Sequence, residues 1–439
     1  MRATTPVDAV KEDKPPLMIG SPAGPNLTVG IQVFLRGQGR FNQDLGNTPD
    51  NHLGEVLARA RIQALGNWGP LTGFVQVQDR RIWGFEASTI SNEGNTDLHQ
   101  GYLDLHGERP STLSGSVRAG RQEIIWGRSR MIGNLTWLPG ARSFNAVRLR
   151  GSYKMLSLDV FGALTGRAQT FTYTDDSVAP PEPVTVRTPG AQLVGGQFGL
   201  DAHQALKLEV IGLYDRAKQH PNNVTLDRYI GDVGGRVWGE PVKGFTYDLE
   251  GHGQFGQNNG LRHRAWAGAG TLAYTHAVGD FKPGIRGGVA LASGHACTGP
   301  SGCAPMQSGD FFNFYPTNHI HYGLVDLMNW SNMRDFELGA TFAAKPGGLK
   351  ISATYHYFQL HEAAGRWTNA GGAQVGAGFD PSNTMNELGH EIDFVLVTKP
   401  WKPLMVQPGY GVFIPTGAGV TLGGDTPQHF LYLWVVFTM

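Results

Sequence analysis

The chain has 439 residues, a formal net charge of zero and a pI of about 7.3. Charged residues make up 16% of it, against about 25% in ordinary domains, and its 62 glycines are roughly twice the usual share of about 7%. No run of about 18 apolar residues occurs, which excludes membrane-spanning helices. A chain that is rich in glycine and aromatic residues and poor in charge is typical of a transmembrane β-barrel.

The first residues differ from the rest. Residues 1–26 are polar and proline-rich, without the continuous apolar segment of a signal peptide. We therefore interpret the chain as a mature form with an added methionine, in which 1–26 form a flexible leader. Residues 27–439 show no repeat and no composition break, and we expect them to form a single barrel domain.

Alternating segments separated by turn residues predict the strands. In Val56–Ala64, the even-numbered positions are all Val, Ala or Ile, and the odd positions hold Leu57, Arg59, Arg61 and Gln63. The other predicted strands are Val29–Arg40, Gly73–Arg81, Leu98–His106, Leu113–Gln122, Ala146–Tyr153, Met155–Ala163, Ala191–Leu200, Leu206–Leu213, Ile230–Trp238, Phe245–Phe255, Ala265–His276, Phe281–Ala290, Asp335–Phe342, Lys350–Phe358, Glu391–Val397, Leu404–Val412 and Phe430–Phe437. About eighteen strands are expected, an even number as in bacterial barrels.

The predicted connections alternate between short and long. The short ones are Gly66–Pro70, Gly107–Thr112, Asp201–Ala205, Gly239–Lys243, Ala277–Asp280, Lys345–Gly348 and Thr398–Lys402. The long ones are Phe85–Thr96, Ile124–Asn145, Thr165–Gly190, Ser293–Arg334 and Gln359–His390. Short periplasmic turns that alternate with long extracellular loops are the topology of an outer-membrane barrel. A propeller or a sandwich does not predict this alternation.

The last predicted strand is apolar and aromatic and has no polar tail. An unpaired edge of this kind would aggregate in a soluble protein, whereas a barrel needs such a strand to close its sheet. We expect Leu431, Leu433, Val435 and Phe437 to face lipid and Tyr432 and Trp434 to point inward. This strand is expected to pair with Val29–Arg40.

In each strand, the polar side chains occupy every second position, and we expect these side chains to line the lumen. Over the first seven strands these positions carry mostly arginine, namely Arg36, Arg59, Arg61, Arg80, Arg118, Arg148 and Arg150, with Asp104 and Asp159 as exceptions. Over the later strands they carry mostly acids, namely Glu209, Asp248, Glu250, Glu337, Glu391 and Asp393, with Lys207, Arg286 and Lys350 as the cations. The sequence thus predicts a basic wall and an acidic wall.

Two interpretations of these walls stay open. An arginine ladder would attract anions and offer weak, interchangeable sites, because a guanidinium matches a carboxylate in geometry. Alternatively, opposed charges neutralise one another and only keep the lumen wet. We favour anion selectivity for the cluster as a whole. Arg128, Arg130 and Arg142 bracket a loop that either enters the mouth or stays on the surface, and we prefer a solvated surface loop.

The remaining candidates concern loops and chemistry. Cys297 and Cys303 lie in a short Gly/Pro-rich loop and are expected to form a local disulfide. Loops Ser293–Arg334 and Thr165–Gly190 are candidate lids. The fifteen histidines form no HExxH motif, and no GxSxG motif occurs, so we expect no enzyme, no metal site and no cofactor.

Four blocks together resemble the bacterial alginate-export family of outer-membrane proteins: Ala119–Glu123, Arg142–Leu149, Phe314–Trp330 and Asn386–Asp393. The resemblance implies an 18-stranded monomeric barrel with an arginine-lined channel for an anionic polysaccharide such as alginate. On the matching positions it assigns Gly120, Arg121, Gln122 and Arg148 to the channel. Arg121 falls on the lipid-facing parity of its strand, so a bulge or a strand end is expected there.

The sequence therefore predicts a barrel in the outer membrane of a Gram-negative bacterium that passes a hydrophilic, anionic saccharide or polymer. Its expected partners are outer-membrane lipid, the saccharide and periplasmic export components, with no nucleic acid. The alternatives are a general or carboxylate-selective porin, a structural barrel around a partner protein, and an outer-membrane enzyme with a Ser/His pair.

Overall fold

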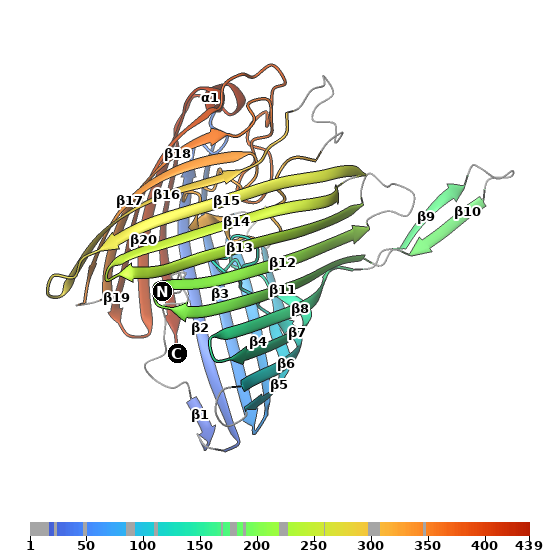
Figure 1. Ribbon diagram of the computed structural model, residues 1–439. Coiled ribbons are helices and arrows are strands. Elements are labelled where there is room, and N and C mark those ends of the chain that lie inside the picture. Colours follow the sequence, from blue (N-terminus) through green and yellow to red (C-terminus); the bar gives the residue numbers. More distant parts are fainter. Residues whose placement is uncertain are drawn as a thin grey trace.

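The computed structural model describes residues 17–21, 24–46, 51–84, 93–108, 113–167, 170–175, 182–187, 190–218, 227–258, 260–296, 308–345 and 348–439. Its main sheet contains nineteen strands, of which β1 is a short edge strand and the other eighteen close into an antiparallel barrel (Figure 1). The predicted fold class and strand number are confirmed. No helix among the described residues is long and apolar enough to cross a membrane.

The barrel strands run in chain order, each paired with its sequence neighbours. They are β2 (Asn26–Phe41), β3 (His52–Trp68), β4 (Leu71–Trp83), β5 (Glu93–Glu108), β6 (Leu113–Gln122), β7 (Phe144–Tyr153), β8 (Leu156–Gly166), β11 (Gly190–His203), β12 (Leu206–Lys218), β13 (Arg228–Val242), β14 (Phe245–Asn258), β15 (Leu261–Thr275), β16 (Phe281–Ala292), β17 (Met333–Ala344), β18 (Leu349–Leu360), β19 (Glu387–Trp401), β20 (Leu404–Pro415) and β21 (Gln428–Thr438). Strands of this length, with one apolar face, can cross a bilayer at a tilt.

Five small elements of the described chain lie outside the barrel wall. β1 (Leu17–Gly20) pairs with the start of β2, and β9 (Thr170–Asp175) pairs with β10 (Glu182–Arg187) in a hairpin that projects from the end of the barrel where the long loops lie. A 3-10 helix, η2 (Asn318–Ile320), and a short helix, α1 (Ala418–Leu422), lie in loops.

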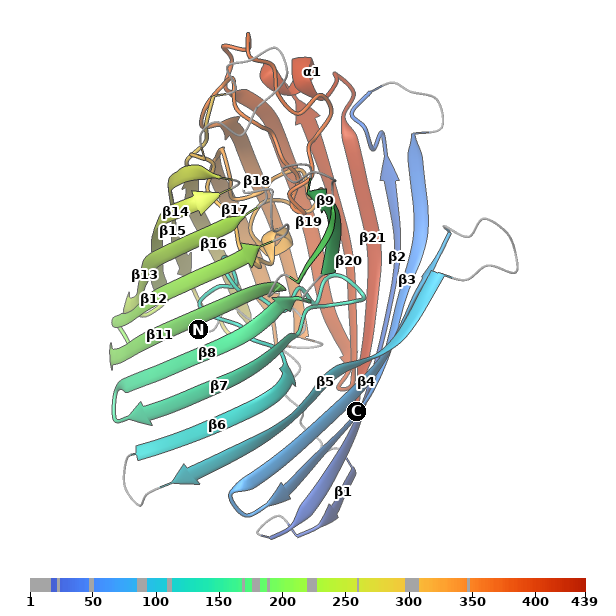
Figure 2. The same cartoon turned by 90° about the vertical axis from the view of Figure 1, so that its right-hand side faces the viewer.

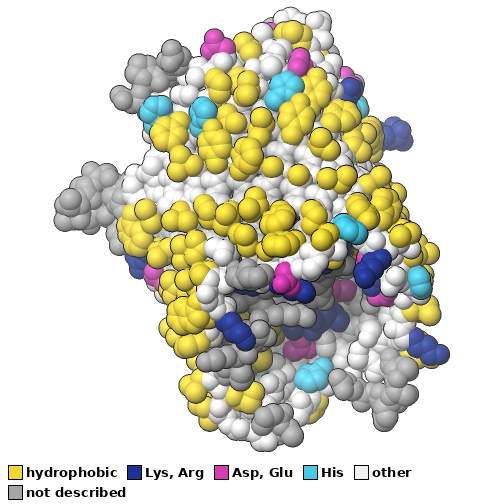
Figure 3. Space-filling model, turned by 90° about the vertical axis from the view of Figure 1, so that its left-hand side faces the viewer, with side chains coloured by type: hydrophobic (Ala, Val, Ile, Leu, Met, Phe, Trp, Pro, Cys, Tyr) yellow, Lys and Arg dark blue, Asp and Glu magenta, His cyan; other side chains and the backbone are white. Residues whose placement is uncertain are grey.

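The barrel closes between its first and last strands. β21 pairs antiparallel with β2 over Gln32–Phe41, as predicted for the C-terminal strand. Leu431 and Leu433 are 45% and 50% exposed on the outer face, whereas Tyr432 and Trp434 are 2% exposed on the inner face. The inside–outside assignment of this strand is therefore confirmed. Apolar side chains also cover much of the outer surface on the side shown in Figure 3.

The expected flexible leader, residues 1–26, contains β1. Leu17 pairs with Val29 and Gly20 with Asn26, so β1 covers the part of β2 that extends beyond the end of β21. An unpaired strand edge exposes backbone donors and acceptors, and β1 satisfies those of β2. This differs from the sequence-based expectation for residues 17–20; residues 1–16 lie outside the described part of the chain.

The parity of the strands predicts a stability difference. Leu433→Arg, in the middle of β21, should destabilise the barrel by about 2–4 kcal/mol because it places a charge in the bilayer. Ser116→Arg, on the lumen parity of β6, should have much less effect, because there the charge faces the interior. Urea unfolding in lipid vesicles measures both. Equal losses of stability would contradict the assignment of the two faces.

Candidate channel constriction

The interior contains two loops as well as charged wall residues. We call the β6–β7 connection, residues 123–143, L3, and the β16–β17 connection, residues 293–332, L7. In Figure 2 their traces (teal and orange) lie within the ring of strands. Ile132 of L3 and Tyr322 and Trp330 of L7 are at most 1% exposed. The preferred interpretation of Arg128, Arg130 and Arg142 as residues of a solvated surface loop is therefore wrong: this loop folds inward.

L3 and L7 are joined by a short ladder of backbone hydrogen bonds. Gly133 N–H donates to the Tyr315 carbonyl and Tyr315 N–H to the Met131 carbonyl, both at 2.9 Å. Thr317 N–H donates to the Ser129 carbonyl, also at 2.9 Å. The loops bind each other like paired strands, so they form one body.

Arginine and histidine side chains strengthen this joint. Arg142 donates to the carbonyls of Gly133, Tyr315 and Pro316. His321 Nε2 lies 2.7 Å from the Arg128 carbonyl oxygen. Burial lowers the pKa of His321 well below its usual value, and the charge of Arg130 lowers it further. The ring is therefore neutral and donates its Nε2–H to that carbonyl.

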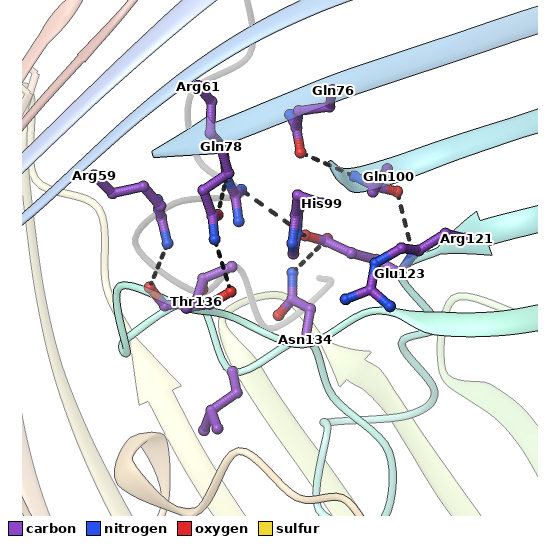
Figure 4. A network of polar contacts seen from close by, with 12 residues as sticks. Arg59, Arg61, Gln76, Gln78, His99, Gln100, Arg121, Glu123, Asn134 and Thr136 are labelled. Atoms are coloured by element: carbon purple, nitrogen blue, oxygen red, sulfur yellow. Dashed lines mark hydrogen bonds and ion pairs between the residues drawn. The ribbon is translucent and has the colours of Figure 1, made fainter. Parts of the chain in front are cut away.

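The basic wall binds the backbone of L3. Arg36 Nη1 donates to the Trp137 carbonyl at 2.7 Å, and its guanidinium lies 3.5 Å from the centre of the Trp137 ring. Arg59 donates to the carbonyls of Thr136 and Leu138, both at 3.3 Å (Figure 4). Both arginines are 1% exposed. Among the described residues, no carboxylate lies within 4 Å of either guanidinium. These two cations therefore bind loop carbonyls and form no ion pair.

Glu123, the first residue of L3, connects the loop to β3 and β5. His99 lies 2.8 Å from one carboxylate oxygen and Asn134 donates to the other at 2.8 Å, while Arg61 lies 3.9 Å away (Figure 4). Burial alone would raise the pKa of Glu123, but the hydrogen bond to His99 and the charge of Arg61 bring it below its usual value. Glu123 is thus a charged acceptor at the base of L3.

The acidic wall binds the backbone of L7. Val325 N–H donates to Glu391 at 2.8 Å, and Leu324 N–H donates to Asp393 at 3.2 Å. Gly323 precedes them with φ +83°, and a Cβ at this position would collide with the Glu391 carboxylate. Glycine thus lets the L7 backbone approach the wall. Glu391 and Asp393, which the sequence assigns to the lumen wall, accept hydrogen bonds from L7 and so hold this loop against β19.

A buried cluster supports the middle of L7. Arg130 of L3 donates to the Tyr322 hydroxyl at 3.2 Å and lies 3.3 Å from Glu250 on β14. Glu250 and Asp232 flank His252, at 3.2 and 2.8 Å. Glu250 was predicted from the sequence as a wall residue, whereas Asp232 and His252 were not. Both occupy inward-facing positions of their strands, and the alternation of the sequence could have indicated this.

Elsewhere the wall charges pair with residues on the next strand or, for Arg150 and Asp104, on the strand after that. Arg118 and Arg150 both lie 2.6 Å from Asp104, and Arg148 pairs with Asp159. On the other side, Arg236 contacts Asp248 at 2.6 Å and Glu209 at 3.4 Å, and Arg286 contacts Glu337 at 2.5 Å. The predicted wall residues therefore face inward, but local pairs neutralise much of both walls. Arg236 was missed, although it too lies on the inner parity.

Two predicted residues differ from this pattern. Arg80 lies on the inner parity of β4, is exposed, and has no hydrogen-bond or ion-pair partner among the described residues. Its guanidinium lies beside Gly140 of L3. Arg121 lies one residue before the end of β6, in regular register with Gly101 and Asn145, and contacts Asp97 at 3.8 Å. A strand end, and not a bulge, accommodates it.

The backbone of β6 requires a glycine at position 120, directly before Arg121. Gly120 has φ +133°, and a Cβ there would collide with the carbonyl oxygen of Gly101 on β5. Gln122, also assigned to the channel by the resemblance, donates to the Ala146 carbonyl at 3.1 Å and is fully buried. The predicted disulfide between Cys297 and Cys303 lies outside the described residues.

An eighteen-stranded barrel with an apolar exterior, a charged interior and loops folded inside is the architecture of an outer-membrane channel. The chain matches the family model for alginate export over residues 26–434 and belongs to that family. The resemblance inferred from four short blocks is thereby confirmed. The fold and the family point to the outer membrane of a Gram-negative bacterium. A comparison with curated proteins finds none that matches.

Solved structures with the same fold include outer-membrane porin barrels. Pseudomonas aeruginosa OccK8 (OprE) is 10% identical, with a TM-score of 0.57 over 94% of this chain and 98% of that chain. Acinetobacter baumannii OccAB1 is 11% identical, with a TM-score of 0.56 over 94% and 97%. Pseudomonas aeruginosa OccK11 (OpdR) is 11% identical, with a TM-score of 0.55 over 94% and 96%. At these identities the likeness concerns the fold alone.

The anchoring of L3 predicts a change in conductance. Arg36→Met with Arg59→Met removes the donors that bind the L3 carbonyls, and each lost charge-assisted hydrogen bond should destabilise the inward position of L3 by about 1.5–3 kcal/mol. Single-channel recording should show larger or noisier conductance. Arg81→Met, which removes an arginine from the outer face and leaves these L3 contacts in place, is the control. Unchanged conductance in the double variant would contradict the anchoring role.

The approach of L7 to β19 predicts a second change. Gly323→Ala should displace the Leu324–Val325 segment from the acidic wall, because the new methyl group meets the Glu391 carboxylate. Gly371→Ala, a loop glycine whose Cβ would meet only the Asn369 side chain, is the control. Protease accessibility of L7 in lipid vesicles should increase only in Gly323→Ala. If L7 is cut equally in both variants, Gly323 is not needed for the approach.

Proposed function

We propose that this channel passes a short, negatively charged saccharide, and that the basic side of the lumen attracts it. The observation that carries the proposal is an excess of guanidinium over carboxylate on β4–β7: Arg118 and Arg150 share Asp104, and Arg80 has no partner among the described residues. Arg80 lies near the outer end of β4 and Arg150 lies in the half of β7 nearer the short turns. Together they offer successive weak sites along one wall.

The opposite wall carries no comparable excess of cations. Arg236 contacts Glu209 and Asp248, and Arg128 of L3 lies 3.7 Å from Asp248, so two guanidiniums balance two carboxylates there. Seen from the end where the short turns lie, the molecule is hollowed, and Lys, Arg, Asp and Glu side chains are visible within the hollow (Figure 3). An anionic solute with many hydroxyl groups can be drawn to the first wall while its neutral edge faces the second.

The inner loops favour a short solute over a wide polymer conduit. L3 and L7 are held on both walls and occupy interior space, so a passing chain must fit beside them or displace them. The same observation disfavours a barrel that sheathes a partner protein, because such a partner would compete with both loops. The family name, alginate export, is consistent with an anionic saccharide but does not fix its length.

A hydrolase receives less support from the described residues. His263 Nδ1 lies 2.6 Å from Ser308 Oγ, but its other nitrogen meets Gln254 at 3.1 Å and not a carboxylate. A Ser/His pair needs an acid to orient the imidazole and stabilise its charged form. Asn258 also donates to the Ser308 hydroxyl at 3.1 Å, so the serine is part of a structural network.

Charge selectivity tests the proposal. Arg80→Gln should shift the reversal potential in planar bilayers toward cations and lower the flux of an oligouronate roughly threefold, because this cation, which has no partner among the described residues, raises the local anion concentration. Arg81→Gln, the next residue but on the outer face and paired with Asp79, should change neither quantity.

The substrate classes are separated by three probes. An oligouronate, a neutral oligosaccharide of the same length and a small monocarboxylate are compared in liposome flux assays. Preference for the oligouronate supports the proposal. Equal flux of all three indicates a general porin, and preference for the monocarboxylate indicates a carboxylate channel. Either of these two results overturns the proposal.

A further inference from the structure

The outer face of β12–β15 carries arginines near the ends of the strands where the long loops lie. Arg216 of β12 is directly opposite Tyr229 of β13, which is opposite Gln257 of β14, which is opposite Arg262 of β15. All four share the outward parity. These strands cross the front of the barrel in Figure 1, with these ends on the right. The row therefore has a cation at each end and an amide between them.

A second cation lies one step nearer the middle of the barrel. Arg264, two residues after Arg262, is opposite Phe255, and both are exposed. Neighbouring strands are about 4.8 Å apart, so the backbones of Arg216 and Arg262 are separated by roughly 14 Å. Arg262 and Arg264 thus form one cationic position, and Arg216 forms a second at the distance of a large headgroup.

These three arginines have no carboxylate partner within 4 Å among the described residues. Arg216 makes one contact, at 6.0 Å over the Tyr229 ring, and its buried Nε has no hydrogen-bond partner. Arg81, an outward arginine on β4, differs: it is held by Asp79 through two hydrogen bonds of 2.8 and 2.7 Å. The barrel thus neutralises one outward arginine and leaves those of β12–β15 available.

An apolar groove begins directly beside Arg264. Its floor is Gly253, its sides are Val233, Phe255 and Trp266, and Arg264 stands at its end. A Cβ on Gly253 would meet no atom closer than 4.0 Å, so the space above it is open. Aromatic side chains of barrels mark the boundary between hydrocarbon and headgroups. Arg216 and Arg262 lie nearer the long-loop ends of their strands than Phe255 and Trp266 do, and Arg264 stands level with Phe255.

We propose that this face, Arg216, Arg262, Arg264 and the groove over Gly253, binds an outer-leaflet lipid whose headgroup carries two phosphates. Arg262 and Arg264 hold one phosphate, Arg216 holds the other, and an acyl chain lies between Phe255 and Trp266. Guanidinium forks match phosphate oxygens, and a lipid supplies both the anion and the apolar chain that this face requires. The inference does not depend on the channel's substrate.

Native mass spectrometry of the intact protein in detergent tests the inference with three lipid probes: diphosphoryl lipid A, monophosphoryl lipid A and phosphatidylcholine. The wild type should bind them with affinity decreasing in that order. Arg216→Gln with Arg262→Gln and Arg264→Gln should weaken binding of the diphosphoryl lipid about tenfold or more, since the variant loses every guanidinium that faces the two phosphates. Arg81→Gln should bind like the wild type.

A second variant separates the groove from the charges. Gly253→Leu, whose Cβ would meet no atom closer than 4.0 Å, fills the groove and should weaken both lipid A forms while keeping the preference for two phosphates. Equal binding of diphosphoryl lipid A by the wild type and the triple variant overturns the proposal, because the three arginines would then be solvated side chains that do not bind the lipid. If inorganic phosphate alone displaces the lipid, the face is a simple anion site and the proposal is overturned. If a dimer appears in place of lipid adducts, the face is a contact between copies and the proposal is also overturned.

Discussion

The interior of this barrel depends on one constraint: loop backbone that leaves bulk water must find hydrogen-bond partners. L3 and L7 have little regular structure, so their carbonyls and amides cannot all pair within a helix or a sheet. The walls supply the missing partners, with arginines on the carbonyls of L3 and carboxylates on the amides of L7. The basic and acidic walls are therefore complementary to the two polar groups of the peptide bond as well as to each other.

This use of charge changes how the arginine ladder is interpreted. Arg36 and Arg59 bind loop carbonyls, and Arg118, Arg148 and Arg150 share wall carboxylates. A count of lumen arginines therefore overstates the field that a solute meets. What remains is a modest excess, greatest where two guanidiniums share Asp104 and where Arg80 has no partner in the described chain. A weak, distributed attraction suits conduction, because a solute that binds too tightly does not leave.

The sequence predicted the wall well and the contents of the lumen poorly, for a physical reason. Alternation in Val56–Ala64 reports a local property, since successive side chains of a strand point to opposite faces. The alternation predicts that Arg59 and Arg61 face the interior, and both are buried there. The contact between Arg59 and Thr136 joins residues that are far apart in the chain, and no periodic pattern encodes it. The same limit applies to Glu391 and Val325. The sequence also could not show that β2 would extend beyond β21 and require β1.

If L3 and L7 form one body held between the two walls, their backbone amides should be protected, and amide hydrogen exchange in lipid vesicles measures this protection. We expect slow exchange for the amides of Gly133, Tyr315, Thr317, Leu324 and Val325, comparable to that of the barrel strands, because each donates to a partner inside the barrel. Exchange of these five amides as fast as that of solvent-exposed loop residues would show that the two loops are not held by the walls.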